Sequence, residues 1–319
     1  MSPLKMGILG AARIAPPALI DPARENPEVE IVAVAARDLG RAQAFAAQHD
    51  IAEALGSYDD LVNHPGIDAV YNALPPSRHA DLTLAALKAG KHVLCEKPFS
   101  MSGDEALAMT DAARDAGLIL MEAFHYRYHP LWARVLEIVR EELGVLQTIE
   151  AEFSVAIAET PDELRFFPEL GGGALGDLGT YCVHWCRSVA GAEPEVISAS
   201  RATHSGGVDL ATRAELAFPG GVRGSITCDM RGPMSGRLIV EGTAGRLTVI
   251  NPLAPQAGHV IKIQIGGERR LETVEKVTTY SCQMAAFVHA VRTGEAPITS
   301  GADTVAQMRV LDAIRARAG

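Results

Sequence analysis

Met6-Gly7-Ile8-Leu9-Gly10-Ala11-Ala12-Arg13-Ile14-Ala15 starts as a short apolar strand and turns through glycine into a helix. This order of elements is typical of a dinucleotide site, because a helix N-terminus offers unpaired backbone N–H groups to the pyrophosphate. Gly10-x-Ala12-x-x-Ala15 is a degenerate form of the G-x-G-x-x-G/A fingerprint. The candidate contacts to the cofactor in this turn are Gly10, Ala12, Arg13 and Ile14.

The first part of the chain, from Lys5 to about Phe124, alternates apolar runs with alanine-rich amphipathic segments. Strands are expected at residues 7–9, 29–35, 69–73, 92–95 and 118–121, and helices at 41–49 and 81–89. Alternation of strand and helix predicts a doubly wound parallel α/β sheet. Residues 1–124 are therefore interpreted as a dinucleotide-binding Rossmann domain.

The pattern changes after about His125. A helix is expected at residues 130–142 and a strand at 147–158, followed by a helix that begins after Gly173 and runs to Ala190. Repeated strands are expected over 195–273, and helices at 283–292 and 302–316. Residues 125–319 are thus predicted to form an α+β substrate-binding and oligomerisation domain with a large, mainly antiparallel open sheet. Such a sheet has a face or edge to cover, so we expect a homodimer, with a tetramer as the alternative.

Composition narrows the possible partners. The chain of 319 residues carries 39 acidic and 29 basic side chains, a net charge of −10, which argues against nucleic acid or an anionic membrane as a partner. No apolar run approaches the roughly 18 residues of a membrane helix, and no signal segment precedes the first strand, so a cytoplasmic protein is expected. Five scattered cysteines predict reduced thiols, and no metal site is expected.

The second strand should end at Ala36-Arg37-Asp38, where a Rossmann domain reads the cofactor's ribose. An arginine is shaped for bidentate contact with the 2′-phosphate of NADP, so Arg37 favours NADP over NAD. Two alternatives stay open. Asp38 could accept from the ribose of NAD, and Arg37 could be an ordinary solvated cation.

A lysine, an acid and a tyrosine form the candidate catalytic set. Lys97 follows the run His92–Cys95, at the strand edge where ligands bind in open α/β sheets. Asp177 and Tyr181 are four residues apart and would share one face of a helix. A nearby cation lowers the pKa of a phenol toward neutrality, so Tyr181 could take a hydroxyl proton, while Lys97 holds the alkoxide or acts as the acid/base itself. Taken singly, each of these residues could equally be structural.

These motifs together resemble the glucose-fructose oxidoreductase (Gfo/Idh/MocA) family over essentially the whole chain. The resemblance rests on the first glycine turn, on Glu96-Lys97-Pro98, and on Gly171 to His184, which partly matches G-G-G-x-L-x-D-x-G-x-H-x-x-D. Tyr181 stands where many members carry a catalytic histidine, and His184 where they carry a second aspartate. The sequence is similar instead to the branch of dimeric dihydrodiol dehydrogenases and NADP-dependent aldose dehydrogenases.

This resemblance implies NADP-dependent hydride transfer to or from a carbinol or carbonyl of a sugar, cyclic polyol or trans-dihydrodiol. It implies a cis bond at Lys97-Pro98, Glu96 near the nicotinamide ribose, and a cofactor-lining set of Asn72, Leu74, Pro75 and His79. For His79 the alternative is a plain helix N-terminal residue. It also suggests Tyr126, Arg127, His184 and Trp185 as substrate contacts, with plain packing the alternative for the last two. The rival function is a nicotinamide-sensing regulatory protein of the same fold without catalysis.

Overall fold

A computed structural model describes residues 2–319, which form two compact units. The first unit comprises residues 2–127 and 280–305, and the second comprises residues 128–279 and 306–319. The domain boundary expected after Phe124 stays a prediction, and the structure groups residues 280–305 with the first unit.

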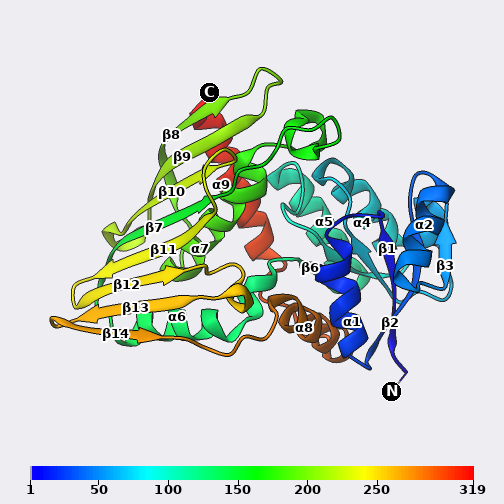
Figure 1. Ribbon diagram of the computed structural model, residues 1–319, viewed down its shortest axis with the longest axis horizontal. Helices are drawn as coiled ribbons and strands as arrows, with labels where there is room; N and C mark the ends of the chain where they lie inside the picture. The colour runs from blue at the N-terminus through cyan, green and yellow to red at the C-terminus, as the bar shows by residue number, and fades with distance from the viewer. Residues whose placement is uncertain (1) are drawn as a thin grey trace. The chain divides into compact units, whose positions relative to one another are not determined.

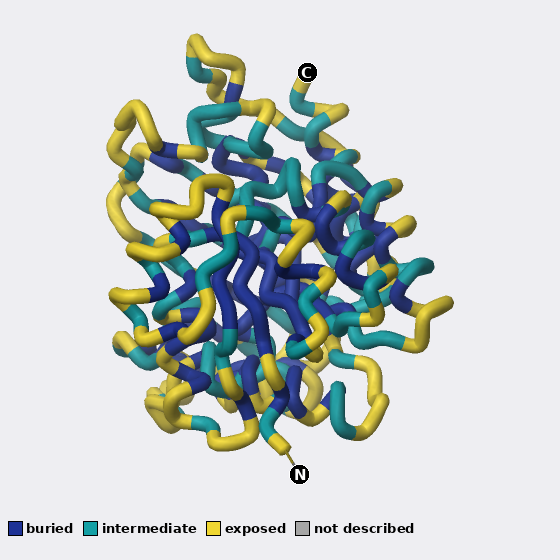
Figure 2. Tube along the Cα trace, turned by 90° about the vertical axis from the view of Figure 1, so that its right-hand side faces the viewer, coloured by how far each residue is buried: buried dark blue, intermediate teal, exposed yellow. Residues whose placement is uncertain are grey.

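Six parallel strands form the sheet of the first unit. They are β1 (Leu4–Leu9), β2 (Val29–Ala35), β3 (Glu53–Leu55), β4 (Ala69–Asn72), β5 (His92–Cys95) and β6 (Leu120–Glu122), in the order β3-β2-β1-β4-β5-β6. The sequence order reverses between β1 and β4, which makes their carboxyl ends the topological switch point where such sheets bind ligands. In Figure 2 the buried chain gathers in the strands of this sheet and the exposed chain in the surrounding loops.

Three of the connecting helices of this unit begin at a residue whose side chain caps the helix. The connecting helices are α1 (Asp21–Glu25), α2 (Leu39–His49), α3 (Tyr58–Val62), α4 (His79–Lys88) and α5 (Gly103–Ala116), joined by α8 (Thr279–Thr293). Ser102 begins α5 by accepting from the N–H of Glu105, and Gly117 ends it at φ +66°. The short β3 and α3 were not expected, because three to five residues are too few to show a period.

Eight strands form the sheet of the second unit. They are β7 (Leu146–Ser154), β8 (Glu195–Thr203), β9 (Asp209–Ala217), β10 (Arg223–Asp229), β11 (Ser235–Gly242), β12 (Gly245–Ile250), β13 (Val260–Ile265) and β14 (Glu268–Glu272). Their order is β14-β13-β12-β11-β7-β10-β9-β8, antiparallel except between β7 and β10. The expected strand over 147–158 was too long, because β7 ends at Ser154, opposite the last residue of β10.

One face of this sheet is covered and the other is not. The side chains of Ile149, Ala151 and Phe153 on β7 are buried, whereas Glu150 between them is exposed. Figure 1 shows α6 (Pro130–Glu141) and α7 (Thr180–Ala190) on one face, and no helix within residues 2–319 covers the other. The last helix, α9 (Ala302–Ala318), has its residues from 306 onward in this unit.

Candidate active site

The first turn of the Rossmann unit has the conformation that its glycine predicts. Gly10 has φ +100°, and its N–H donates to the carbonyl of Ala35 over 2.9 Å. A Cβ atom at Gly10 would lie 2.9 Å from Cδ2 of Leu74, so the absence of a side chain lets the loop after β1 lie against the loop after β4. The exposed Arg13 follows in the same turn. This arrangement fits a dinucleotide pyrophosphate.

The side chains at the end of β2 suit NADP, whose ribose carries a 2′-phosphate, better than NAD, whose ribose does not. Oδ1 of Asp38 accepts from the backbone N–H of Arg41 over 2.8 Å, so this carboxylate caps α2. Arg37 is exposed beside it. Arg41, which was not predicted, reaches back with Nη2 to the carbonyl of Ala11 over 3.1 Å. Two guanidinium groups therefore belong to the segment at the end of β2, and this donor set fits the 2′-phosphate of NADP.

Asn72 and His79 brace the loop that follows β4. His79 is fully buried, with Nε2 lying 2.7 Å from the carbonyl of Leu74 and Nδ1 lying 2.9 Å from that of Pro98. Nδ2 of Asn72 donates to the carbonyl of His79 over 3.3 Å, and Asn72 Oδ1 accepts from Leu74. Asn72 and His79 thus fix the half-buried Leu74 and Pro75, and they join this loop to the one after β5.

Lys97 lies in a group of titratable side chains within the first unit. Its peptide bond to Pro98 is cis, as the resemblance implies. Burial, and secondly the charge of Lys97, lowers the pKa of His125 to about 3. Burial likewise lowers the pKa of His79, with Lys97 as a minor cause. The depressed pKa keeps His125 uncharged at neutral pH. The half-buried Lys97 therefore has no second positive charge at His125 beside it.

Glu96 is tied to two tyrosines of the same unit. Its Oε1 accepts from the hydroxyl of Tyr71 on β4 over 2.7 Å. Burial, and secondly the charge of Glu96, raises the pKa of Tyr280 above its usual range. The Tyr280 ring lies against His125 with centroids 4.2 Å apart. Tyr280 was not predicted, since nothing in its sequence spacing links α8 to the end of β5.

Asp177 and Tyr181 lie on two successive elements rather than on one regular helix. Residues Leu175–Gly179 form a π-helical turn that carries Asp177, and α7 begins at Thr180. Wide turns of this kind are frequent at functional sites. A Cβ atom at Gly179 would lie 2.9 Å from Sγ of Cys228 on β10, so this glycine lets the turn pack closely on the sheet.

Arg165, which was not predicted, forms an ion pair with Asp177. It also pairs with Glu163, a second residue that was not predicted. Nε of Arg165 donates to Oδ2 of Asp177 over 2.5 Å, and Nη1 donates to Glu163 over 2.9 Å. The carbonyl of Arg165 accepts from the N–H of Gly173 over 2.9 Å. These contacts come from the irregular segment 159–170, whose conformation no periodicity could reveal.

Aromatic side chains surround Tyr181, which is 6% exposed. The ring of Phe153 meets it edge-on at a centroid distance of 5.8 Å, and Trp185 lies 6.4 Å away. Trp185 in turn stacks on Trp132 at 6.4 Å. These rings are all buried, so Tyr181 is held within an aromatic cluster of the second unit.

The structure places the weaker substrate candidates mostly in the interior. Tyr126 and Trp185 are fully buried, His184 is 1% exposed, and only Arg127 is half-buried. For Trp185, the stacking on Trp132 supports the packing alternative. Lys97, Tyr126 and Arg127 belong to the first unit, and Asp177, Tyr181 and Trp185 to the second.

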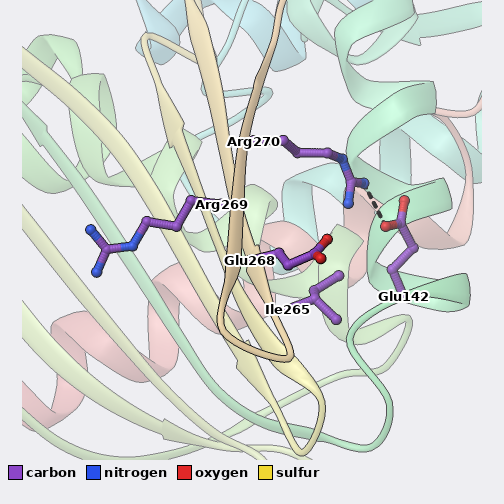
Figure 3. Close-up of a pocket in the computed structure, with 5 residues that line it drawn as sticks. All are labelled: Glu142, Ile265, Glu268, Arg269 and Arg270. Atoms are coloured by element: carbon purple, nitrogen blue, oxygen red, sulfur yellow. Dashed lines mark hydrogen bonds and ion pairs between the residues drawn. The ribbon is translucent and has the colours of Figure 1, made fainter.

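A separate cavity of about 350 Å³ lies at the β13–β14 hairpin and is lined by Glu142, Ile265, Glu268, Arg269 and Arg270. In Figure 3 Arg270 points to Glu142, with which it forms an ion pair, while Arg269 points away. None of the predicted site residues lines this cavity.

Two further features concern the helices and the cysteines. Among residues 2–319, no helix combines the length and the apolar character needed to cross a membrane. Each of the five cysteines is a free thiol.

Two family models match the chain. The description of the first is an oxidoreductase family with an NAD-binding Rossmann fold, and it covers residues 4–124. The second is the GFO/IDH/MocA C-terminal domain, covering residues 132–248.

Individual proteins resemble the chain over most of its length. D-xylose 1-dehydrogenase (NADP(+)) 2 from Haloferax volcanii is 37% identical over 98% of this chain and 96% of its own. Trans-1,2-dihydrobenzene-1,2-diol dehydrogenase from Sus scrofa is 39% identical over 70% of this chain and 67% of its own. The crystal structure of KijD10, a 3-ketoreductase from Actinomadura kijaniata in complex with NADP and TDP-benzene, superposes with a TM-score of 0.93, at 28% identity, over 99% of this chain and 98% of that one.

Proposed function

Because the chain belongs to the Gfo/Idh/MocA oxidoreductase family, we propose that Lys97, Asp177 and Tyr181 carry its reaction on a sugar, cyclic polyol or trans-dihydrodiol. The protein is an NADP-dependent oxidoreductase of CH–OH and carbonyl groups in sugar-like substrates. The observation that supports the assignment of residues is the pairing of Asp177 with Arg165, one turn before Tyr181.

In the proposed oxidation, the substrate loses a hydride from its carbinol carbon and a proton from its hydroxyl group, and different groups take the two. When bound, the cofactor would supply the hydride acceptor (NADP) for the carbinol carbon, or the hydride donor (NADPH) in the reverse direction. Tyr181 takes the hydroxyl proton as general base, and Lys97 stabilises the negative charge that develops on the alkoxide oxygen. Asp177 orients the hydroxyl, with Arg165 holding its carboxylate in place. Lys97 as the direct acid/base is the variant of this mechanism.

The cofactor would be held along the carboxyl edge of the six-stranded sheet. We assign the pyrophosphate to Gly10, Ala12, Arg13 and Ile14, and the 2′-phosphate to Arg37 with Ala36, Asp38 and Arg41 beside it. Leu74 and Pro75 would line the ribose and nicotinamide, supported from behind by Asn72 and His79. Glu96, held by Tyr71, would lie near the nicotinamide ribose.

A turnover screen tests this assignment. Purified protein is assayed with NADP and with NAD against aldoses, inositols, anhydrosugars and trans-cyclic diols. Lys97→Met and Tyr181→Phe should each lower turnover roughly 10²-fold or more, because each removes a group that moves or stabilises a charge. Lys88→Met, at an exposed lysine near the end of α4, is the matched control and should keep parental turnover. Near-parental turnover in both site variants would refute the residue assignment.

The regulatory alternative finds no support, since the relatives described above are named for dehydrogenase and reductase activities. Tight NADPH binding with no turnover on any substrate of the screen would reopen it.

We also propose that the protein is a cytoplasmic homodimer. The open face of the eight-stranded sheet supports the dimer, because pairing with a second subunit is a common way to cover such a face. Five free thiols are in keeping with a reducing compartment.

Sedimentation equilibrium of the parent and of Glu150→Arg, which adds a cation to the middle of the open sheet face, tests the dimer. A monomeric parent would refute it.

A further inference from the structure

The π-helical turn that carries Asp177 has no capping side chain of its own. Its first flanking residue, Ala174, offers no side-chain acceptor, and residue 173 is a glycine. The backbone N–H of Leu175 is nevertheless bonded, to Oδ2 of Asp209 over 2.8 Å. Asp209 is the first residue of β9, so a strand 34 positions further along the chain supplies the cap.

The carboxylate of Asp209 is itself fixed. Oδ2 also accepts from the hydroxyl of Thr212 over 2.6 Å. On its other side, a Cβ atom at Gly173 would overlap Oδ1, so the carboxylate fills the space that the glycine leaves. Gly173 has φ +114°, a conformation that residues with side chains rarely adopt.

The same few residues hold both partners of the Arg165–Asp177 ion pair. The N–H of Gly173 donates to the carbonyl of Arg165 over 2.9 Å, and its carbonyl accepts from the N–H of Asp177 over 3.1 Å. A shift of Gly173 would therefore move the loop of Arg165 and the turn of Asp177 together. The Asp209 carboxylate, which bonds the Leu175 N–H and fills the space beside Gly173, holds Gly173 in place.

We propose that Asp209 is a positioning residue for the reaction, acting through the Leu175 N–H on the placement of Asp177 and, one turn on, Tyr181. The inference rests on the proposed function of Asp177. Small displacements of reacting groups are costly, since about 1 Å can lower a rate roughly 10²-fold. Asp209→Ala should accordingly lower kcat about tenfold or more, with KM for the sugar and Kd for NADPH changed less than about threefold.

A double-mutant cycle separates positioning from general destabilisation. Asp209→Ala is measured in the parent and in an Asp177→Asn background. If Asp209 acts through Asp177, its loss should cost about tenfold in the parent and less than about twofold in the second background. Asp209→Asn should recover most of kcat, because an amide oxygen in the position of Oδ2 can still accept from both the Leu175 N–H and the Thr212 hydroxyl.

Ser57→Ala is the matched control, since it removes a cap from α3, where Ser57 Oγ accepts from Asp60 over 3.3 Å. It should leave kcat at the parental value. An equal loss from Asp209→Ala in both backgrounds would overturn the positioning role and leave the proposed function intact. Near-parental turnover in Asp177→Asn alone would overturn the proposed function and the positioning role together.

Discussion

The guanidinium of Arg165 donates to the carboxylate of Asp177 over 2.5 Å, and the two side chains are 39% and 16% exposed. Glu163, with only 8% of its side chain exposed, accepts from the same guanidinium. One guanidinium thus bridges two carboxylates, and hydrogen bonds of this charge-assisted kind hold side chains in defined positions. The loop that bears Arg165 therefore takes part in orienting the proposed catalytic carboxylate.

Arg165→Ala should lower kcat by roughly 10- to 100-fold, because a hydrogen bond to a charged group contributes about 1.5–3 kcal/mol. Arg165→Lys should recover only part of this loss, since an ammonium group cannot reach both Asp177 and Glu163 in the planar geometry of the parent. The measurement is steady-state kinetics at saturating NADPH. Arg315→Ala, which removes an arginine paired with Asp312 on α9, should retain parental kcat. Equal kcat values for Arg165→Ala and Arg315→Ala would show that the ion pair plays no part in turnover.

Arg37 and Arg41 should decide between the two nicotinamide cofactors. Arg37→Ala is expected to lower kcat/KM for NADP by roughly 10- to 100-fold, about 1.5–3 kcal/mol, and to change the value for NAD less than about threefold. Arg41→Ala should act in the same direction. It also removes the 3.1 Å bond to Ala11, so NAD turnover should fall as well.

The control for this pair is Arg24→Ala, at an arginine paired with Asp21 on α1. Its cofactor preference should match the parent. A parallel loss for NADP and NAD in Arg37→Ala would place this side chain away from the 2′-phosphate.

Acid should destabilise the protein partly through His125. Burial, and secondly the charge of Lys97, lowers the pKa of His125 from 6.5 to about 3. Between these values the unfolded chain binds a proton at His125 that the folded protein does not, so stability rises with pH by up to about 1.4 kcal/mol per pH unit. Above about pH 6.5, His125 is uncharged in both states and does not lower the free energy of unfolding. As the pH falls from 6.5 toward 3, the free energy of unfolding declines.

His125→Phe keeps a ring against Tyr280 and removes the titration. Urea unfolding from about pH 7.5 to 4.5 should therefore show a shallower pH dependence in this variant than in the parent. His289→Phe, at an exposed histidine paired with Glu295, should leave the dependence unchanged. The same slope in His125→Phe and the parent would assign the acid sensitivity to other buried histidines.

The elements that could be predicted correctly from the sequence are those with a strong local pattern. Gly10 with its flanking strand and helix, and the apolar run before Lys97, were sufficient to predict the parallel sheet and its ligand-binding edge. Arg165 and Asp209 could not be found in this way, because each reaches Asp177 or its turn from a distant segment. The bond from Asp209 to Leu175 spans 34 positions and has no period. The π-helical turn was missed for a related reason, since one extra residue in a turn leaves the apolar spacing of α7 unchanged.

Gly173 provides the most direct test of this long-range support, because a second glycine serves as its control. Gly191, which ends α7, has φ +61°, and a Cβ atom there would have no other atom within 4 Å, whereas a Cβ atom at Gly173 would overlap the Asp209 carboxylate. Gly191→Ala should cost only the backbone strain, about 1–2 kcal/mol in urea unfolding, with parental kcat. Gly173→Ala must also displace the Asp209 carboxylate, so its loss should exceed about 3 kcal/mol and kcat should fall about tenfold or more. If the two variants lose the same stability and keep the same kcat, the contact between Gly173 and Asp209 does not support the site.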